Sequence, residues 1–295
     1  MATRRGSRLP IKPSQFVLGL GLVFAVLIVA SGIIGAQSAT HDPSRISREV
    51  FVNIPGAMRA LFYTVTPLLF VAAGWLFFLR VQNWERGQPD RRATTTKNIR
   101  KRLDDLRSGL YMQTLLRDPA AGVMHSLIYF PFLILFAVTT VLEIDHLLPD
   151  SAKFLHGGVY QGYKFVGDTA GVLFLIGIGW AILRRYVWRP YRLRIKTRPE
   201  DGMILGTFLV IGVTGLFVQA VRIALVGRPS FERWAYIGYP LSWLFKDVSQ
   251  HDLQVTHQVL WGVHIVAFLT FVVLVPTTKL RHMFTSPLNM YLHDR

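Results

Sequence analysis

The chain has 295 residues, of which 51% are hydrophobic, and 33 basic against 17 acidic side chains give a formal charge of +16. With only 17% charged residues and a positive mean hydropathy, it is too apolar for a soluble globular protein. The absence of cysteine excludes disulfides, thiolate zinc sites and iron–sulfur clusters ligated by this chain. The basic excess is typical of proteins that bind nucleic acid or span a membrane, so the position of the charges must decide.

Six apolar stretches are long enough to cross a hydrocarbon core about 30 Å thick, which needs roughly 20 apolar residues per helix. In chain order they are residues 16–36, 60–78, 123–142, 159–183, 203–225 and 259–275. The first is too long for the core of a signal peptide, and five further stretches follow it, so we expect it to be retained. The sequence therefore predicts an all-α membrane bundle of six transmembrane helices over residues 16–278.

Basic residues alternate between the segments that connect these stretches. Together, residues 1–15, 80–117, 184–198 and 279–295 carry 24 of the 33 Lys and Arg side chains. Such an excess marks the cytoplasmic side of a membrane protein. We therefore expect both termini, 1–15 and 279–295, to be cytoplasmic tails, as an even number of spans requires. Topology explains the charge, and no nucleic-acid partner is expected.

Two connecting segments are long enough to have structure of their own. The inner segment 80–120 is expected to hold a short helix around Thr96–Leu116. The outer segment 226–255 is rich in aromatic residues and is expected to lie on the bilayer surface, where Trp and Tyr are enriched.

Histidines gather in three of the six predicted spans. Five of the nine lie in or at the ends of the third, fourth and sixth spans, and a sixth follows the last span; they are His125, His146, His156, His257, His264 and His282. Because ionisable groups are costly inside a bilayer, each is a functional candidate. A single histidine there is often a packing residue, but four at matched depths favour a shared role.

The depths of these histidines match in two pairs. His264 and His282 are 18 residues apart, which is five turns and roughly 27 Å on a continuous helix, although Pro276 can bend it. His125 lies at the inner end of the third span and His146 at its outer end. Two imidazoles that face each other across a bundle can hold a haem iron. The pattern predicts an inner haem between His125 and His282.

A second, outer haem is predicted at His264, and its other ligand is open between two residues. His146 follows the same two-helix arrangement as the inner pair, whereas His156 starts the fourth span at a compatible height. His257, one heptad before His264, is expected at the membrane interface.

Three further charged residues lie within the predicted spans and are candidates for quinone or haem-propionate binding. Lys164 and Asp168 are spaced i, i+4 on the fourth span, so they could instead pair with each other. Arg222 lies in the outer part of the fifth span. Its guanidinium could bind a propionate, or it could reach out to the lipid interface.

The tract LWGVHIVAFLTFVVLVPTTKLRHMFTSPLNMYL, Leu260–Leu292, resembles the last helix of the nitrate reductase gamma subunit family. In that family an outer histidine, a proline and an inner histidine follow one another, and both histidines bind haem b, which implies this role for His264 and His282. The third span, MHSLIYFPFLILF, resembles the helix that supplies the inner haem's other ligand, which implies His125. Apolar residues around Leu135 stand where the family has a second histidine on that helix, so His146 and His156 both stay open.

The whole chain resembles the amino-terminal membrane domain of heterodisulfide-reductase-like proteins of actinobacteria, which are similar to electron-transfer-flavoprotein:menaquinone oxidoreductases. In those proteins HMFTSPLN leads into a cytoplasmic domain with iron–sulfur clusters, so here the clusters are expected beyond residue 295 or on a separate subunit. The resemblance implies two haem b groups, menaquinone as substrate and a bacterial plasma-membrane location. It also implies an iron–sulfur partner and an electron-transfer flavoprotein. Lys164 lies about one turn from the family's quinone-site lysine.

Together these features predict a membrane cytochrome b subunit of a quinone-linked respiratory oxidoreductase, which is not catalytic alone. A transporter with a histidine proton relay is one alternative, although the first two spans are almost wholly apolar. A membrane anchor without redox function is another, but it leaves the matched histidine depths unexplained.

Overall fold

The computed structural model describes residues 12–37, 46–88, 95–113 and 115–292, and every regular element in these ranges is helical. Parts of both predicted tails and of the inner segment lie outside the described residues, including Arg4, Arg5, Arg8, Arg91, Arg92 and Arg295. Six long helices form the bundle: α1 (Pro13–Gln37), α2 (Gly56–Glu85), α4 (Pro119–Leu147), α5 (Gly157–Ile182), α7 (Pro199–Leu225) and α9 (Gln250–Thr277).

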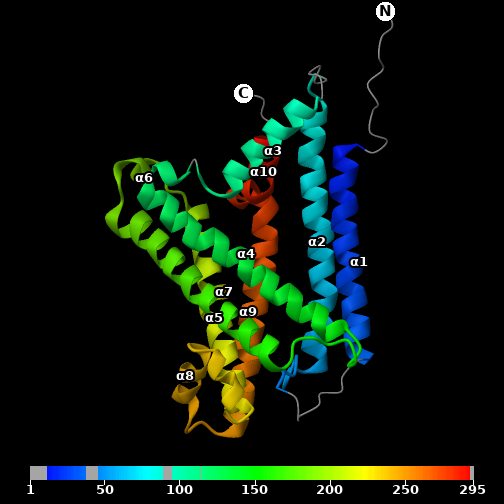
Figure 1. The fold of residues 1–295 in the computed structure, drawn as a ribbon, viewed down its shortest axis with the longest axis vertical. Coiled ribbons are helices and arrows are strands. Elements are labelled where there is room, and N and C mark those ends of the chain that lie inside the picture. Colours follow the sequence, from blue (N-terminus) through cyan, green and yellow to red (C-terminus); the bar gives the residue numbers. More distant parts are fainter. Residues whose placement is uncertain (1–11, 38–45, 89–94, 114, 293–295) are drawn as a thin grey trace, which may run out of the picture.

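Five of the six predicted spans are confirmed as helices long and apolar enough to cross a membrane, namely α2, α4, α5, α7 and α9. The first predicted span forms α1, whose apolar stretch Ser14–Ala30 is shorter than those of the other five. The all-α fold is therefore as predicted, while the count of six spans stays a prediction. The start of α1 and the helix α10 lie at the same end of the molecule, as cytoplasmic placement of both termini would require (Figure 1).

Short helices gather at the two ends of the bundle. They are α3 (Thr96–Leu110), η1 (Leu115–Arg117), η2 (Leu183–Trp188), α6 (Tyr191–Lys196), η3 (Ser230–Trp234), α8 (Gly238–Ser242), η4 (Trp243–Phe245), η5 (Lys279–Arg281) and α10 (His282–Leu292). Figure 1 shows α3, α6 and α10 at one end and α8 at the other. We call these the basic end and the α8 end. The predicted short helix of the inner segment is confirmed as α3.

Local sequence signals determine where several helices begin. The Asp118 carboxylate accepts a hydrogen bond from the Ala121 N–H at 3.2 Å, and Pro119 follows as the first residue of α4. The Ser249 hydroxyl accepts one from the Asp252 N–H at 3.1 Å at the start of α9. These side chains satisfy N–H groups that have no partner within the first helical turn.

The helices α1 and α2 form a closely packed antiparallel pair. A Cβ atom on Gly21 of α1 would lie 3.2 Å from the Cα atom of Gly74 on α2, so only glycine allows this approach. At the basic end, the Glu85 carboxylate accepts hydrogen bonds from the Ser14 N–H at 2.8 Å and hydroxyl at 2.9 Å. The end of α2 therefore caps the start of α1.

The last long helix is not continuous to His282, contrary to the assumption behind the five-turn spacing. Pro276 has no N–H to donate and its ring crowds the preceding turn, so α9 ends at Thr277. Thr278 is extended, with φ −116° and ψ −168°, and the short helix η5 follows before α10 begins at His282. The chain therefore turns between the two histidines.

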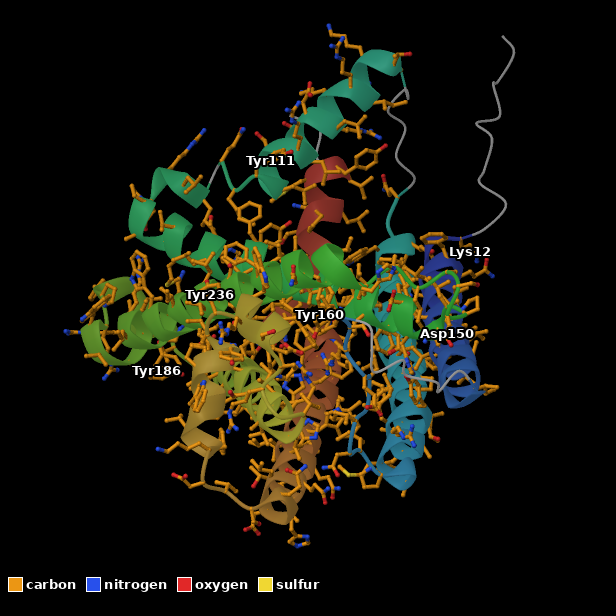
Figure 2. All side chains as sticks on the ribbon, turned by 60° about the horizontal axis from the view of Figure 1, so that its bottom comes forward. Lys12, Tyr111, Asp150, Tyr160, Tyr186 and Tyr236 are labelled. Carbon is orange, nitrogen blue, oxygen red and sulfur yellow. The ribbon has the colours of Figure 1, made fainter. Side chains whose placement is uncertain are left out.

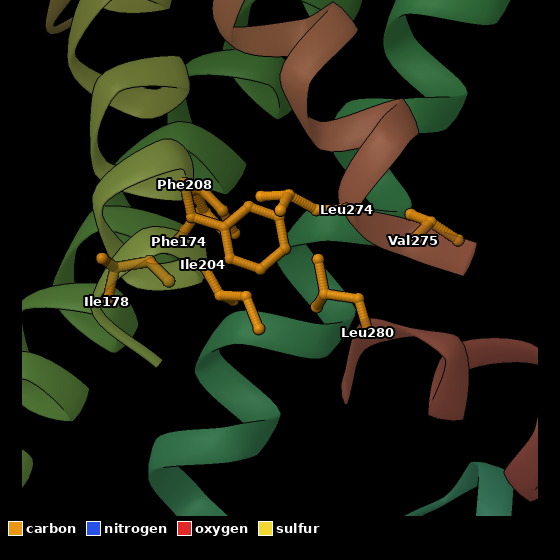
Figure 3. Packing of buried hydrophobic residues seen from close by; sticks show 7 residues of the cluster. All are labelled: Phe174, Ile178, Ile204, Phe208, Leu274, Val275 and Leu280. Atoms are coloured by element: carbon orange, nitrogen blue, oxygen red, sulfur yellow. The ribbon is translucent and has the colours of Figure 1, made fainter. Parts of the chain in front are cut away.

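The apolar core lies where α5, α7 and α9 cross, and Figure 3 shows its buried side chains. They are Phe174, Ile178, Ile204, Phe208, Leu274, Val275 and Leu280. Phe132 and Leu135 of α4 pack against this cluster, and the Phe132 ring lies 5.5 Å from that of Phe271. Leu135, near the position where the family that the sequence resembles has a second histidine, therefore packs in the apolar core.

The outer segment 226–255 does not simply lie on a membrane surface as predicted. Its short helices close the α8 end of the bundle, and Glu232, Ala235 and Ser242 are buried. Some aromatic side chains do face outward, since Trp243 is 53% exposed. The segment inserts because its one buried carboxylate meets charged partners inside the bundle, as described below.

Candidate functional site

His125 and His282 are brought together at the basic end. Their ring centres lie 6.2 Å apart, with the ring planes inclined by 65°. His125 lies on α4 and is half-buried, with its Nδ1 buried and without a hydrogen-bond partner. His282 is exposed and is the first residue of α10. The predicted inner pair therefore faces across a helix–helix junction.

A backbone carbonyl orients the His282 ring. Nδ1 of His282 lies 2.7 Å from the carbonyl oxygen of Lys279. A carbonyl can only accept, so Nδ1 must carry the proton and donate. In a neutral ring this leaves the lone pair of Nε2 free for a metal ion, which is the usual arrangement of metal-binding histidines.

The separation of the two rings suits a single metal ion between them. Imidazole–metal bonds are about 2.0 Å long, so two rings on opposite sides of one metal have centres about 6 Å apart. Within residues 12–37, 46–88, 95–113 and 115–292, no three His, Cys, Asp or Glu side chains are grouped to hold a metal. A pair of histidines suits haem, because the porphyrin supplies the other four ligands.

His264 is held from α7 by a comparable second contact. Its Nδ1 lies 3.0 Å from Oγ1 of Thr214, whose hydroxyl also donates to the Val210 carbonyl at 2.5 Å. Because the hydroxyl has one proton and uses it on Val210, Nδ1–H of His264 is the donor to Thr214. Nε2 is again left with a free lone pair. Gly215 lies under the ring, where a Cβ would be 3.4 Å from Cε1.

The two candidates for the fourth ligand lie in different surroundings. His146 is half-buried near the end of α4, and its ring lies 5.6 Å from that of Phe51. The Phe51 ring is 6.2 Å from that of Trp261, which precedes His264 by less than one helical turn. His156 is exposed at the start of α5. The fourth ligand therefore stays a prediction with these two candidates.

His257 lies inside the protein rather than at its surface. Its side chain is only 2% exposed, and neither ring nitrogen has a hydrogen-bond partner. His257 lies close to Arg48 and to Arg222 of α7. Its predicted position at the membrane interface, one heptad before His264, stays a prediction.

A buried ion cluster closes the α8 end of the bundle. Its centre is Glu232, whose Oε1 accepts hydrogen bonds from Arg222 at 2.8 Å and from the Tyr160 hydroxyl at 2.7 Å. Nζ of Lys164 lies 3.3 Å from Oε2, which makes no hydrogen bond. Lys164, Arg222 and Glu232 are 3%, 3% and 1% exposed. Figure 2 shows Tyr160 well inside the molecule and Tyr186 at its edge.

The cluster decides between alternatives left open by the sequence. Lys164 pairs with Glu232 rather than chiefly with Asp168. Asp168 accepts hydrogen bonds from Gln219 at 2.5 Å and from two N–H groups at the start of α8, at 2.8 and 3.0 Å. It thereby fastens the outer segment to α5. Arg222 is buried, so it does not extend to the lipid interface.

The charges around Glu232 keep it ionised. Burial alone would raise the pKa of Glu232, but Arg222 and Lys164 lower it to about 2. Burial lowers the pKa of Arg48, which lies close enough to Arg222 to add to that effect. Sequence reasoning missed Glu232 and Arg48 because both lie in connecting segments. The sequence signal for Glu232 was its position as an acidic residue ten positions after Arg222, a cation in a predicted span.

The chain matches a known protein family and two curated proteins. The model of one family, the nitrate reductase gamma subunit, matches residues 130–295, so His125 lies five residues before the matched segment. The chain is similar to an EtfAB:quinone oxidoreductase of Syntrophomonas wolfei, with 33% identity over 187 residues, 61% of this chain and 26% of that protein. It is also similar to a probable iron–sulfur-binding oxidoreductase, FadF, of Bacillus subtilis.

That second similarity has 26% identity over 183 residues, 61% of this chain and 25% of the relative. The chain thus spans about a quarter of the length of the curated relatives it matches. No solved structure matches it.

Proposed function

Because the chain belongs to the nitrate reductase gamma subunit family, we propose that it is a membrane cytochrome b subunit or domain of an oxidoreductase. It passes electrons between an iron–sulfur or flavoprotein partner at its basic end and quinone in the membrane. The quinone and the iron–sulfur partner in this proposal are taken from the names of the two relatives. Haem b, menaquinone and the bacterial plasma membrane are taken from the sequence resemblance described above.

The facing pair His125–His282 carries this proposal. Two imidazoles whose ring centres lie 6.2 Å apart, one of them oriented by a carbonyl so that Nε2 is free, would hold the haem iron between them. When bound, a haem with two imidazole ligands carries one electron at a time and leaves no iron position open to oxygen or substrate. The protein's part is to hold both rings and to exclude other iron ligands.

A second ligand set is proposed at His264, with His146 or His156 as its partner. Thr214 holds the His264 ring in the tautomer that leaves Nε2 free. Between the two levels, the aromatic layer of Phe132, Phe208 and Phe271 excludes water, with ring centres 5.5–6.0 Å apart. Electrons would therefore cross the bundle through a dry interior.

Quinone exchange is proposed at the α8 end, beside Lys164. An ammonium has three donors, and its ion pair with Glu232 uses at most one. Lys164 can therefore donate to a quinone carbonyl while staying neutralised. Arg222, paired with Glu232, keeps that carboxylate in place. Asp168 acts indirectly, since it holds the outer segment over the cluster.

An optical spectrum tests the proposal most directly. The full chain, purified in detergent after expression with ample haem, should show reduced-minus-oxidised bands of low-spin haem b at about two haems per chain. Bands of the expected shape at one haem per chain would reduce the proposal to a single site, and His282→Ala would show whether it is the inner one. A folded, haem-free preparation would contradict the proposal as a whole.

The outer ligand can be identified by exchanging its two candidates. His146→Ala and His156→Ala leave the inner pair untouched, so only the true ligand should remove the second spectral component. If neither variant removes it, both assignments are wrong.

The quinone site is tested by kinetics. Lys164→Ala should slow the oxidation of reduced haem by a menaquinone analogue, because the carbonyl loses a donor. Lys153→Ala is the matched control, since Lys153 pairs with Asp150 in the loop before α5. Equal rates in both variants and in the unmodified chain would exclude Lys164 from the site.

A further inference from the structure

The carbonyl that orients His282 belongs to a residue that is itself held at two points. Lys279 is the first residue of η5, directly after the extended residue Thr278. Its backbone N–H donates to Glu200 at 2.5 Å, and its ammonium donates to Asp201 at 2.7 Å. Both acceptors lie in the first turn of α7.

Asp201 is anchored independently of Lys279. It is only 5% exposed and accepts a hydrogen bond from the N–H of Arg198, the residue before α7, at 2.8 Å. Nη1 of Arg185, in the π-helical turn η2 after α5, lies 2.6 Å from the same oxygen, Oδ2, while Lys279 binds Oδ1. The acidic pair therefore ties the end of α5 and the start of α7 to η5.

This arrangement leaves the Lys279 peptide little freedom to move. Its N–H is fixed by Glu200, its side chain by Asp201, and its carbonyl receives the His282 Nδ1–H. The last helical hydrogen bond of α9 runs from the Thr278 N–H to the Leu274 carbonyl at 3.0 Å, so the helix does not hold the Lys279 N–H. Glu200 and Asp201 hold Lys279 instead, and the Lys279 carbonyl is the group that orients the His282 ring.

We infer that Glu200 and Asp201 are positioning residues for the His282 ligand and act on it through Lys279. The inference rests on the proposed function, in which His282 binds the inner haem. Groups that orient a metal-binding histidine typically change metal affinity 10–100-fold when they are removed. Here that contact is indirect, so the lower part of the range is expected.

The test compares Glu200→Ala, Glu200→Gln and Asp201→Asn in the full chain, with Asp104→Asn as a control for an exposed carboxylate on α3. Haem release to excess apomyoglobin and the low-spin electron paramagnetic resonance spectrum are recorded for each haem. Glu200→Ala and Asp201→Asn should release the inner haem about 10-fold faster and shift its resonance. Glu200→Gln keeps an oxygen acceptor and should largely restore both.

The outer haem and Asp104→Asn should match the unmodified chain. Circular dichroism and size exclusion separate these effects from misfolding. If Asp201→Asn does not fold, Glu200→Ala decides alone, because it removes one contact to a backbone N–H. Folded variants with unchanged release and resonance would overturn the inference but not the proposed function. An unmodified chain that binds no haem would contradict the proposed function itself.

Discussion

The two ends of the bundle treat their polar residues in opposite ways. At the basic end, His125 and His282 face each other without a bond between them, and each keeps a nitrogen free for a ligand. At the α8 end, Glu232 is already surrounded by Arg222, Lys164 and Tyr160. The first pair is proposed to be completed by a bound haem, whereas the charges of the second already neutralise one another within the chain.

The difference follows from chemistry. A neutral imidazole can remain half-buried at a modest cost in free energy, so the two histidines can keep their positions before a ligand binds. An ionised carboxylate or guanidinium cannot, because desolvation of an unpaired charge in a membrane interior is costly. Substitutions at the basic end should therefore change cofactor binding, and those at the α8 end should change stability.

The largest effect is expected for His282→Ala. It removes one of two axial ligands, so haem content should fall by about one per chain while the fold is retained. Haem is counted as the pyridine complex, and the fold is followed by circular dichroism. His251→Ala, at an exposed histidine near the start of α9, serves as the control. Full haem content in His282→Ala would exclude the inner ligand assignment.

At the α8 end, Glu232→Gln should destabilise the chain without removing haem. It leaves Arg222 and Lys164 buried without a counter-charge, and breaking a buried ion pair typically costs about 3–5 kcal/mol. Thermal unfolding in detergent measures the loss. Asp150→Asn, which breaks an exposed pair with Lys153, should cost less than about 1 kcal/mol. Comparable losses in the two variants would mean that the cluster does not stabilise the fold.

The sequence predicts those features of the two ends that depend on single helices, and it does not predict contacts between segments that are far apart in the chain. The spans and the pairing of His125 with His282 follow from periodicity and depth, which are local properties of each helix. The position of Glu232 does not, because the chain after α7 must fold back so that Glu232 meets Arg222, ten residues earlier, and Lys164 of α5. Pro276 predicts a bend in the last helix, but the contacts of Glu200 and Asp201 with Lys279 depend on the start of α7 meeting the end of α9, which no local pattern predicts.

The ion cluster should also make stability depend on pH. Arg222 and Lys164 lower the pKa of Glu232 to about 2, from an ordinary value of 4.5. A carboxyl group with a lowered pKa in the folded state stabilises the fold above its unfolded value and loses this effect as pH falls. The melting temperature should therefore decline between about pH 4.5 and pH 2, and Glu232→Gln should remove this part of the decline. An identical pH profile in that variant would assign the effect to other carboxylates.

The smallest effect is expected at His264, where Thr214→Val replaces a hydroxyl by a methyl of similar size. The His264 ring then loses its contact with the Thr214 hydroxyl, so the tautomer that frees Nε2 is less strongly favoured. The outer haem should bind about 10-fold more weakly, while the inner haem and the melting temperature stay nearly unchanged. Thr270→Val is the matched control, since its exposed hydroxyl donates only to the Val266 carbonyl. Weaker binding of the outer haem alone would show that Thr214 orients His264 independently of the contact between Lys279 and His282 at the basic end. Equal weakening of both haems would instead mean that α7 positions the two ligands as a unit.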